Sequence, residues 1–321
     1  MTVRVPAKVN LQLAVGPVRS DGYHELVTVF HAVSLYDEVT VTRAEAASVA
    51  VSGEGADQVP AGEANLAARA VAALARAAGR GQRGPRPAPA SADAVTAIPP
   101  VAITIRKRIP VAAGLAGGSA DAAAALVAYN ELWRTGLSQA ELGDLAAGIG
   151  SDVAFALVGG TAVGQGRGER LTPALVAGEY HWVLAYAARS LSTPDVYRAC
   201  DRIRDARGYN VTPPRLSTEL MSALRSGDPT QVGPLLSNDL QPAAVSLRPE
   251  LRRTLAVGRE YGALGAIVSG SGPTCAFLVA DAQRAVDLVV ALTGAGVCRS
   301  AVRATGPAPG AAVVSPSGVS R

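Results

Sequence analysis

PVAAGLAGGSADAAAA, from Pro110 to Ala125, is the stretch that decides the fold. Its first half carries Gly114, Gly117 and Gly118 around a single leucine, and it has too little side-chain bulk to build a core. A glycine-rich loop that leads into a helix directs several backbone N–H groups toward one point, where a phosphate fits. The stretch matches neither G-x-x-x-x-G-K-[ST] nor a clear G-x-G-x-x-G pattern. The alternative is a small-residue turn that lets a helix pack closely on a sheet.

The second half of this stretch predicts a helix over residues 120–133. Ser119 can cap its N-terminus, Asp121 falls in the first turn, and the alanine run that follows has the highest helix propensity available. A second helix is expected over residues 136–147, where Ser138 and Glu141 match a capping box.

The composition is that of an ordinary globular protein, and the length favours two domains. The 321 residues are 49% hydrophobic and 17% charged, enough to bury a large core. The net charge of +4 is spread along the chain and only 4% of residues are aromatic, so no nucleic-acid partner is expected. Residues 1–13 do not match a signal peptide, and no apolar run approaches the roughly 18 residues of a membrane span. We therefore expect a cytoplasmic protein without a membrane partner, in which Cys200, Cys275 and Cys298 are plain thiols.

Lysine is scarce, because only Lys8 and Lys107 occur among the 30 basic residues. Arginine serves as nearly every surface cation here, so a retained lysine is a candidate for work that a planar guanidinium does poorly. One such task is to act as a point charge beside a phosphate or a reacting hydroxyl. Lys107 lies in the run 106–108, RKR, directly before the glycine loop, where three cations favour a phosphate environment. A solvated charge cluster is the alternative.

The N-terminal half begins with a predicted half-buried strand over residues 3–15, with Lys8 and Asn10 on its polar face. An Asp-Gly turn then places Tyr23 and His24 side by side, either as ligand contacts or as capping and packing residues. Further strands are expected over residues 27–34, 37–42 and 101–105.

A helix over residues 64–78 begins near Asn65, whose ordinary role would be a cap. Residues 79–100 are rich in Gly, Pro, Arg and Ala and predict a mobile insert. Asp152 stands in a glycine-flanked turn, where a single carboxylate can be a helix cap or a base. A hairpin over 159–168 precedes a domain junction expected near 172–179.

The second half predicts a strand over 181–187 and a helix start at Thr193-Pro194. A second glycine-rich turn, Gly270–Thr274, lies between two apolar strands, and a structural hairpin would explain it equally well. Further helices are expected over residues 196–206, 218–226, 232–236, 249–261 and 282–293, with a turn at 238–240, a last strand over 297–305 and a loose tail from Gly306.

Four motifs follow one another: the strand with Lys8 and Asn10, then P-x-x-x-G-L-x-G-G-S-x-D-x-A, G-S-D-V and S-G-S-G-P-T. In this order they resemble the GHMP kinase superfamily over nearly the whole chain. The resemblance implies a two-domain α/β (α+β) fold with the active site in the cleft between the domains. An N-terminal kinase domain would span 1–175, a C-terminal ferredoxin-like domain 176–305, and a loose tail 306–321. The segments PAKVNLQL and SDGYHEL resemble members that act on a cytidine diphosphate-linked methylerythritol in the non-mevalonate isoprenoid route.

The resemblance implies transfer of the ATP γ-phosphoryl group to the 2-hydroxyl of that small molecule, with Mg²⁺ bridging the phosphates near Ser119. Asp152 would take or orient the hydroxyl proton, and Lys8 would sit beside it. Tyr23 and Tyr197 would sandwich the cytosine ring. His24 would hydrogen-bond the edge of that ring, and Asn10 would hold the substrate near the reacting carbon.

The same resemblance implies the rest of the site. Gly270, Ser271 and Gly272 would close the floor of the cleft. The expected ATP-binding residues are Asn65, Leu66, Lys107, Pro110, Val111, Ala112, Ala113, Gly114, Leu115, Ala116, Gly117, Gly118 and Ser119.

The chain departs from the family pattern at two points. Ala116 replaces a glycine that is common in the loop, and the insert is longer than usual. Two other functions remain open: a superfamily kinase acting on homoserine or a mevalonate derivative, and a non-catalytic nucleotide-binding regulator. A base sandwich is of no use to a small aliphatic substrate, and the retained Lys8 and Asp152 argue against a regulator. The sequence leaves monomer and homodimer open.

Overall fold

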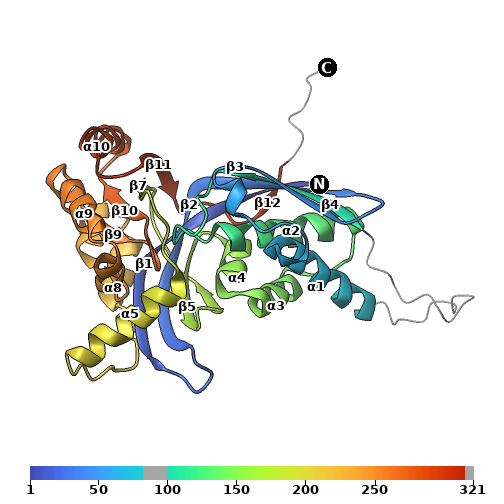
Figure 1. Ribbon diagram of the computed structural model, residues 1–321, viewed down its shortest axis with the longest axis horizontal. Coiled ribbons are helices and arrows are strands. Elements are labelled where there is room, and N and C mark those ends of the chain that lie inside the picture. Colours follow the sequence, from blue (N-terminus) through green and yellow to red (C-terminus); the bar gives the residue numbers. More distant parts are fainter. Residues whose placement is uncertain (82–99, 315–321) are drawn as a thin grey trace, which may run out of the picture.

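Two sheets and their helices make up the molecule (Figure 1). The structure is a computed structural model that describes residues 1–81 and 100–314. The first sheet has the order β12-β1-β2-β4-β3; in addition, β5 pairs with β2, β6 pairs with β5, and β8 pairs with β1. Its strands are β1 (Thr2–Val18), β2 (His24–Arg43), β3 (Ser48–Gly53), β4 (Val101–Lys107), β5 (Thr161–Gly166), β6 (Arg170–Pro173), β8 (Ser237–Asn238) and β12 (Ala312–Val313).

β1 and β2 are long antiparallel neighbours, and their hairpin runs between the two halves of the molecule (Figure 1). The two strands expected over 27–34 and 37–42 are one strand, β2. Three register shifts interrupt its pairing with β1, and such irregularities let paired strands bend without ending. β3, which the sequence analysis did not predict, pairs in parallel with β4.

Four helices belong to the first sheet: α1 (Leu66–Gly81), α2 (Gly117–Trp133), α3 (Gln139–Ile149) and α4 (Ser151–Val158). α2 contacts α1 and α4 as well as β1 and β2, and residues 120–126 are buried. A helix that is apolar on all sides is stable only inside the protein, and the alanine run lets its neighbours approach closely. The capping box predicted for α3 is confirmed, with Ser138 and Glu141 bonded reciprocally.

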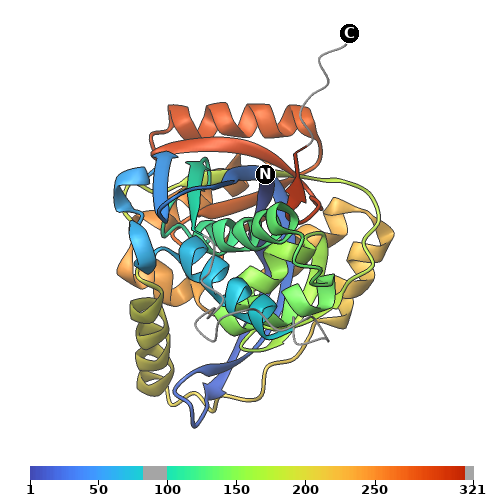
Figure 2. The same cartoon turned by 90° about the vertical axis from the view of Figure 1, so that its right-hand side faces the viewer.

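The second sheet is antiparallel, with the order β11-β7-β10-β9. Alternate residues of β7 face opposite sides: Trp182 and Leu184 join the core beneath the first sheet, while Val183 and Ala185 pack toward the C-terminal helices. α10 lies across β11 and β7 (Figure 2). The strands are β7 (Tyr180–Tyr186), β9 (Gly265–Val268), β10 (Cys275–Val279) and β11 (Ser300–Gly306).

The helices of this half lie close to their predicted positions. They are α5 (Thr193–Ala206), α6 (Thr218–Ser226), α7 (Pro229–Val232), α8 (Gln241–Leu247), α9 (Glu250–Glu260) and α10 (Ala282–Gly294). α8 was not predicted, and the helix expected over 232–236 is α7 followed by a 3₁₀ turn, Gly233–Leu235. Three 3₁₀ turns in all are assigned in the described ranges, the others being Ala56–Gln58 and Gly62–Ala64.

The loose tail expected from Gly306 is wrong over residues 306–314. Val313 pairs with Val3, and Ala308 is buried and donates its N–H to the Ala32 carbonyl. The segment covers the edge of β1, whose backbone groups would otherwise be unpaired. The Pro- and Gly-rich composition of the segment gives no indication of this pairing. The insert expected over 79–100 begins later, because α1 continues to Gly81, and its remaining residues 82–99 lie outside the described part of the chain.

Among the described helices, none is both long enough and apolar enough to cross a membrane. The three cysteines are free thiols, as predicted, with Cys200 and Cys275 buried. Burial raises the pKa of the Cys275 thiol to about 12, so this thiol stays protonated and unreactive.

Candidate active site

A cleft of about 700 Å³ lies where β1, β2, the N-termini of α2 and α4, and the turn after β9 meet. It is the meeting point of motifs that are far apart in the sequence. The predicted site residues that line it are Lys8, Asn10, Leu66, Ala112, Ala113, Gly114, Ala116, Gly117, Gly118, Ser119, Asp152, Tyr197, Gly270 and Ser271.

Other predicted residues lie outside the lining of this cleft. Leu115 is fully buried, and only its carbonyl reaches the site strand, where it accepts the Lys8 N–H at 3.3 Å. Pro110 and Val111 line a second cavity on another side of the loop. The following predicted residues also do not belong to its lining: Asn65, Lys107, Tyr23, His24 and Gly272.

The N-terminus of α2 supplies the donors of the cleft. The first bond within the helix runs from the Ala120 N–H to the Ala116 carbonyl, so the N–H groups of Gly117, Gly118 and Ser119 have no acceptor within the described chain. A Cβ placed on Gly118 would meet nothing within 4 Å. Unpaired amides at the positive end of a helix form a ready-made anion site.

Ser119 does not cap this helix, so that prediction is wrong. α2 begins at Gly117, three residues before the predicted start, and its N-cap is Ala116 in the left-handed region (φ 61°) with no side-chain cap. The reason is the loop itself: glycines allow the backbone to enter the helix at residue 117. Asp121 is therefore past the first turn and points elsewhere. Ser119 is left half-buried on the cleft wall, with its hydroxyl available to a ligand.

The loop is fastened to the glycine-rich turn of the C-terminal half. Ser269 Oγ donates to the Gly114 carbonyl at 3.1 Å, and the Thr274 N–H donates to the Ala113 carbonyl at 3.2 Å. Gly114 has φ +78°, and a Cβ there would lie 2.1 Å from the Ser269 carbonyl oxygen. Glycine is required at this position by both backbone conformation and space.

Lys8 lies at the bottom of the cleft and is 6% exposed. Its Nζ donates to Asn10 Oδ1 at 2.6 Å, Asn10 Nδ2 donates to Thr28 Oγ1 at 2.8 Å, and Thr28 Oγ1 donates to the Gln12 carbonyl at 2.7 Å. This chain fixes the direction of the Asn10 amide and presents the ammonium to the cleft. Burial lowers the pKa of Lys8, and the negative charge of Asp152 opposes that shift.

Asp152 is half-buried in the first turn of α4, whose N-cap is Gly150 with no side-chain cap bond. Its carboxylate makes no salt bridge within residues 1–81 and 100–314, although Lys8 lines the same cleft. Asp152 is therefore a carboxylate on the cleft wall that is available to a ligand, in the field of one lysine.

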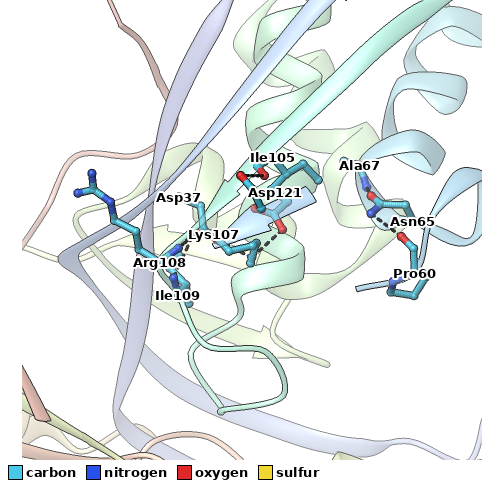
Figure 3. A network of polar contacts seen from close by, with 10 residues as sticks. Asp37, Pro60, Asn65, Ala67, Ile105, Lys107, Arg108, Ile109 and Asp121 are labelled. Atoms are coloured by element: carbon cyan, nitrogen blue, oxygen red, sulfur yellow. Dashed lines mark hydrogen bonds and ion pairs between the residues drawn. The ribbon is translucent and has the colours of Figure 1, made fainter. Parts of the chain in front are cut away.

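Lys107 belongs to a buried ion cluster behind the loop (Figure 3). Its Nζ donates to Asp37 Oδ2 at 2.5 Å and to Asp121 Oδ2 at 2.7 Å. Asp37 Oδ1 also accepts the N–H groups of Arg108 and Ile109 at 2.6 and 2.9 Å. The interpretation of run 106–108 as an open phosphate-binding cluster is wrong for Lys107, because two carboxylates occupy its ammonium.

The cluster carries one positive and two potential negative charges in a dry environment. Burial raises the pKa of Asp121 well above its ordinary value; the charge of Lys107 opposes this and that of Asp37 adds to it. Burial alone would lower the pKa of Lys107, but Asp121 and Asp37 outweigh it and raise that pKa. The ammonium therefore stays charged, and Asp121 holds its proton more tightly than an ordinary aspartic acid does.

Asn65 is the cap of α1 (Figure 3). Its Oδ1 accepts the Ala67 N–H at 2.9 Å, its Nδ2 donates to the Pro60 carbonyl at 2.9 Å, and the residue is 3% exposed. Both the oxygen and the nitrogen of the side-chain amide are bonded to the protein backbone, so Asn65 positions the next residue, Leu66, which lines the cleft.

Aromatic side chains lie at the far end of the cleft. The rings of His24 and Tyr197 pack with centroids 5.0 Å apart, and His24 Nε2 lies 2.9 Å from Asp201 Oδ1. Tyr23 is exposed, and the Arg167 guanidinium lies 5.1 Å from its ring centroid. Tyr197 and Arg167 line the cleft itself.

Sequence reasoning missed Thr28, Phe30 and Arg167 on the cleft wall and Asp37 behind it. Thr28 and Phe30 alternate on β2 as Lys8 and Asn10 do on β1, so the pairing of these strands was the only available signal. No sequence signal distinguished Arg167 from the other arginines.

The residues present suit a nucleotide that brings its own metal. Among residues 1–81 and 100–314, no group of three His, Cys, Asp or Glu side chains could hold a metal ion. The cleft offers the Ser119 hydroxyl and the Asp152 carboxylate, which are oxygen ligands of the kind that Mg²⁺ accepts while phosphate oxygens hold it.

The fold and this cleft define a two-domain small-molecule phosphotransferase. The pattern of the GHMP kinases N terminal domain matches residues 65–160, and that of the GHMP kinases C terminal domain matches residues 220–298.

Curated relatives align with this chain over nearly its full length. The 4-diphosphocytidyl-2-C-methyl-D-erythritol kinase of Mycolicibacterium gilvum (strain PYR-GCK) is 55% identical over 316 residues, which cover 98% of this chain and 92% of that protein. The kinase of the same name from Nocardia farcinica (strain IFM 10152) is 54% identical, covering 98% and 96%. A crystal structure of 4-(cytidine 5'-diphospho)-2C-methyl-D-erythritol kinase superposes with TM-score 0.73 at 33% identity, covering 95% of this chain and 98% of that one. The chain belongs to the GHMP kinase family and, within it, to the 4-diphosphocytidyl-2-C-methyl-D-erythritol kinases.

Proposed function

We propose that the chain transfers the γ-phosphoryl group of ATP to the 2-hydroxyl of 4-diphosphocytidyl-2-C-methyl-D-erythritol, in the methylerythritol phosphate route to isoprenoid precursors. The names of the full-length relatives support this substrate. The observation that carries the proposal is the convergence of three unpaired amides, Lys8 and Asp152 on one cleft that ends at Tyr197.

The donor end of the cleft is the N-terminus of α2. The amides of Gly117, Gly118 and Ser119 would receive phosphate oxygens, and Leu66 would form an apolar wall for the adenine. Mg²⁺, when bound, would neutralise the phosphate charge that grows on the leaving group. The Ser119 hydroxyl is the protein ligand we assign to it.

The reacting end lies between Lys8 and Asp152. In the transfer, the bond from the γ-phosphorus to its bridging oxygen breaks, a bond to the acceptor oxygen forms, and the acceptor hydroxyl loses its proton. Asp152 is the carboxylate that would take or orient this proton. Lys8 would stabilise the charge on the same oxygen, and its bond to Asn10 fixes the ammonium in place.

The acceptor end is built for a flat base. Tyr197 and Tyr23 supply two phenol rings, one from α5 and one from the turn before β2. His24 Nε2 is engaged by Asp201, which leaves Nδ1 for the edge of the cytosine. We assign cytosine stacking to the tyrosines, because a stacked base gains affinity from an aromatic face whatever its hydrogen bonds.

A phosphoryl-transfer assay tests the proposal with ATP, Mg²⁺ and a panel of the cytidylyl substrate, homoserine and mevalonate. We expect turnover of the cytidylyl compound alone. Turnover of homoserine or mevalonate without the cytidylyl compound would assign the chain to another branch of the family, and binding of ATP without any turnover would support a regulator.

A further inference from the structure

A second cavity of about 330 Å³ lies beyond the nucleotide loop, away from the amides of α2. Pro110 and Val111 line it, and Ala112 and Ala113 line both this cavity and the main cleft. Its other wall comes from the C-terminal half, from residues 186–190 and Pro273. Its volume lies at the lower end of the range for small-molecule sites, roughly 300–1,000 Å³.

All the charged side chains in the lining of this cavity are positive. Three arginines line it, Arg189, Arg248 and Arg299, and none of the described residues in its lining is Asp or Glu. Arg299 is paired with Glu54 at 2.5 Å, and Arg248 donates to the carbonyls of Leu247 and Ser190. Arg189 is exposed and has no ion pair within residues 1–81 and 100–314.

Buried hydrogen-bonding atoms in the same lining lack partners. Tyr186 is 5% exposed and Thr274 is fully buried, and neither hydroxyl has a partner in the described protein; the same holds for Arg248 Nε. Such groups are rare in folded proteins, since each one left unpaired is costly, and a ligand is one way to satisfy them. Burial raises the pKa of the Tyr186 hydroxyl, so this group remains a donor at neutral pH.

We propose that this cavity binds a small phosphorylated molecule, with its phosphate between Arg189 and Arg248 and an oxygen toward the Tyr186 hydroxyl. Guanidinium groups match phosphate oxygens in pairs, and the unpaired hydroxyls add donors for the remaining oxygens. This cavity shares residues with the nucleotide loop: Thr274 and Ala113 both line it, and the Thr274 N–H donates a hydrogen bond to the Ala113 carbonyl. A ligand here would therefore change the affinity of the loop for nucleotide, and nucleotide would change its affinity in return.

Calorimetric titration of methyl phosphate into the full-length protein saturated with ADP tests this site, because ADP fills the main cleft. At constant ionic strength we expect one molecule bound per chain, and no comparable binding of acetate. Arg189→Ala and Tyr186→Phe should each weaken methyl phosphate binding about tenfold or more, the effect of losing a charged or buried donor. Arg253→Ala, an exposed arginine of α9 away from the cavity, is the matched control and should bind as the wild type.

Three results would overturn the proposal. The first is loss of methyl phosphate binding in the presence of ADP, which would place the phosphate in the main cleft. The second is binding by the two cavity variants that is as tight as that of Arg253→Ala. The third is the absence of methyl phosphate binding by the wild type.

Discussion

Replacing Lys107 with methionine should cost about 3–5 kcal/mol of unfolding free energy, because it leaves two buried carboxylates without their cation. Asp37 is fully buried and Asp121 is 3% exposed, so water cannot replace the ammonium. Asp37 keeps the N–H groups of Arg108 and Ile109, but one oxygen of Asp121 already lacks a partner in the described chain. The loss is a large share of a typical stability of about 5–15 kcal/mol.

Urea unfolding at pH 7, followed by tryptophan fluorescence, measures this loss. Arg106→Met is the matched control, because Arg106 is the exposed neighbour of Lys107 on β4 and its replacement should change stability by less than about 0.5 kcal/mol. If Lys107→Met and Arg106→Met unfold at the same urea concentration, the ammonium does not support the fold. If Lys107→Met instead has a raised KM for ATP and unchanged stability, Lys107 binds the nucleotide and does not support the fold.

Because the pKa of Asp121 is raised, the contribution of this cluster to the unfolding free energy depends on pH, and the direction of this dependence is fixed. The folded protein holds this proton more tightly than the unfolded chain, whose Asp pKa is about 3.9. The resulting stabilisation is complete below that value and is lost as pH rises through the higher, folded-state pKa. Asp121→Asn removes the titrating proton, so it should flatten the pH dependence of the unfolding free energy, measured by urea unfolding at pH 4 and pH 7. A pH dependence in Asp121→Asn as steep as that of the wild type would refute the assignment to Asp121.

Three further predictions concern the cleft. Asp152→Asn should lower kcat by about 10²-fold or more while ADP affinity is unchanged, because a positioned base is worth this much; full activity would remove Asp152 from the chemistry. Tyr23→Ala should weaken binding of the cytidylyl substrate by about 1–3 kcal/mol, the worth of one base stack, and an unchanged KM would make this tyrosine structural. Gly114→Ala should lower stability by about 1–3 kcal/mol or more, since its Cβ would meet the Ser269 carbonyl at 2.1 Å in a left-handed backbone; Gly118→Ala, with open space around it, is the control, and equal melting temperatures would refute the argument.

The parts of the fold that local sequence decides were predictable. α6 coincides with residues 218–226, and α3 begins at the predicted capping box. The parts that depend on distant partners were not. β3 exists because it pairs with β4, and residues 306–314 are ordered because they cover β1 and contact β2 and α4. The alternation in β3, where Val49 and Val51 are half-buried between exposed residues, is too short to decide a strand by itself, and residues 306–314 are rich in Pro and Gly.

For the site, the scarcity of lysine singled out two residues that are both buried, but it did not distinguish their roles. Both Lys8 and Lys107 are buried, and one lies in the cleft while the other holds two carboxylates behind the loop. Adjacency to the loop predicted a phosphate ligand for Lys107. Asp37, which accepts a hydrogen bond from the Lys107 ammonium, lies 70 positions earlier in the sequence, so no local motif contains both residues.

The structure also explains why these two positions are lysine in a chain that otherwise uses arginine. Each ammonium lies against a glycine of a glycine-rich motif: a Cβ on Gly117 would lie 3.1 Å from Lys107 Nζ, and one on Gly270 would lie 3.0 Å from Lys8 Nζ. A guanidinium is larger than an ammonium and planar, so it does not fit beside the loop backbone where a compact ammonium does. The glycines of both motifs therefore make room for the two cations, one that lines the cleft and one that holds the helix behind the loop.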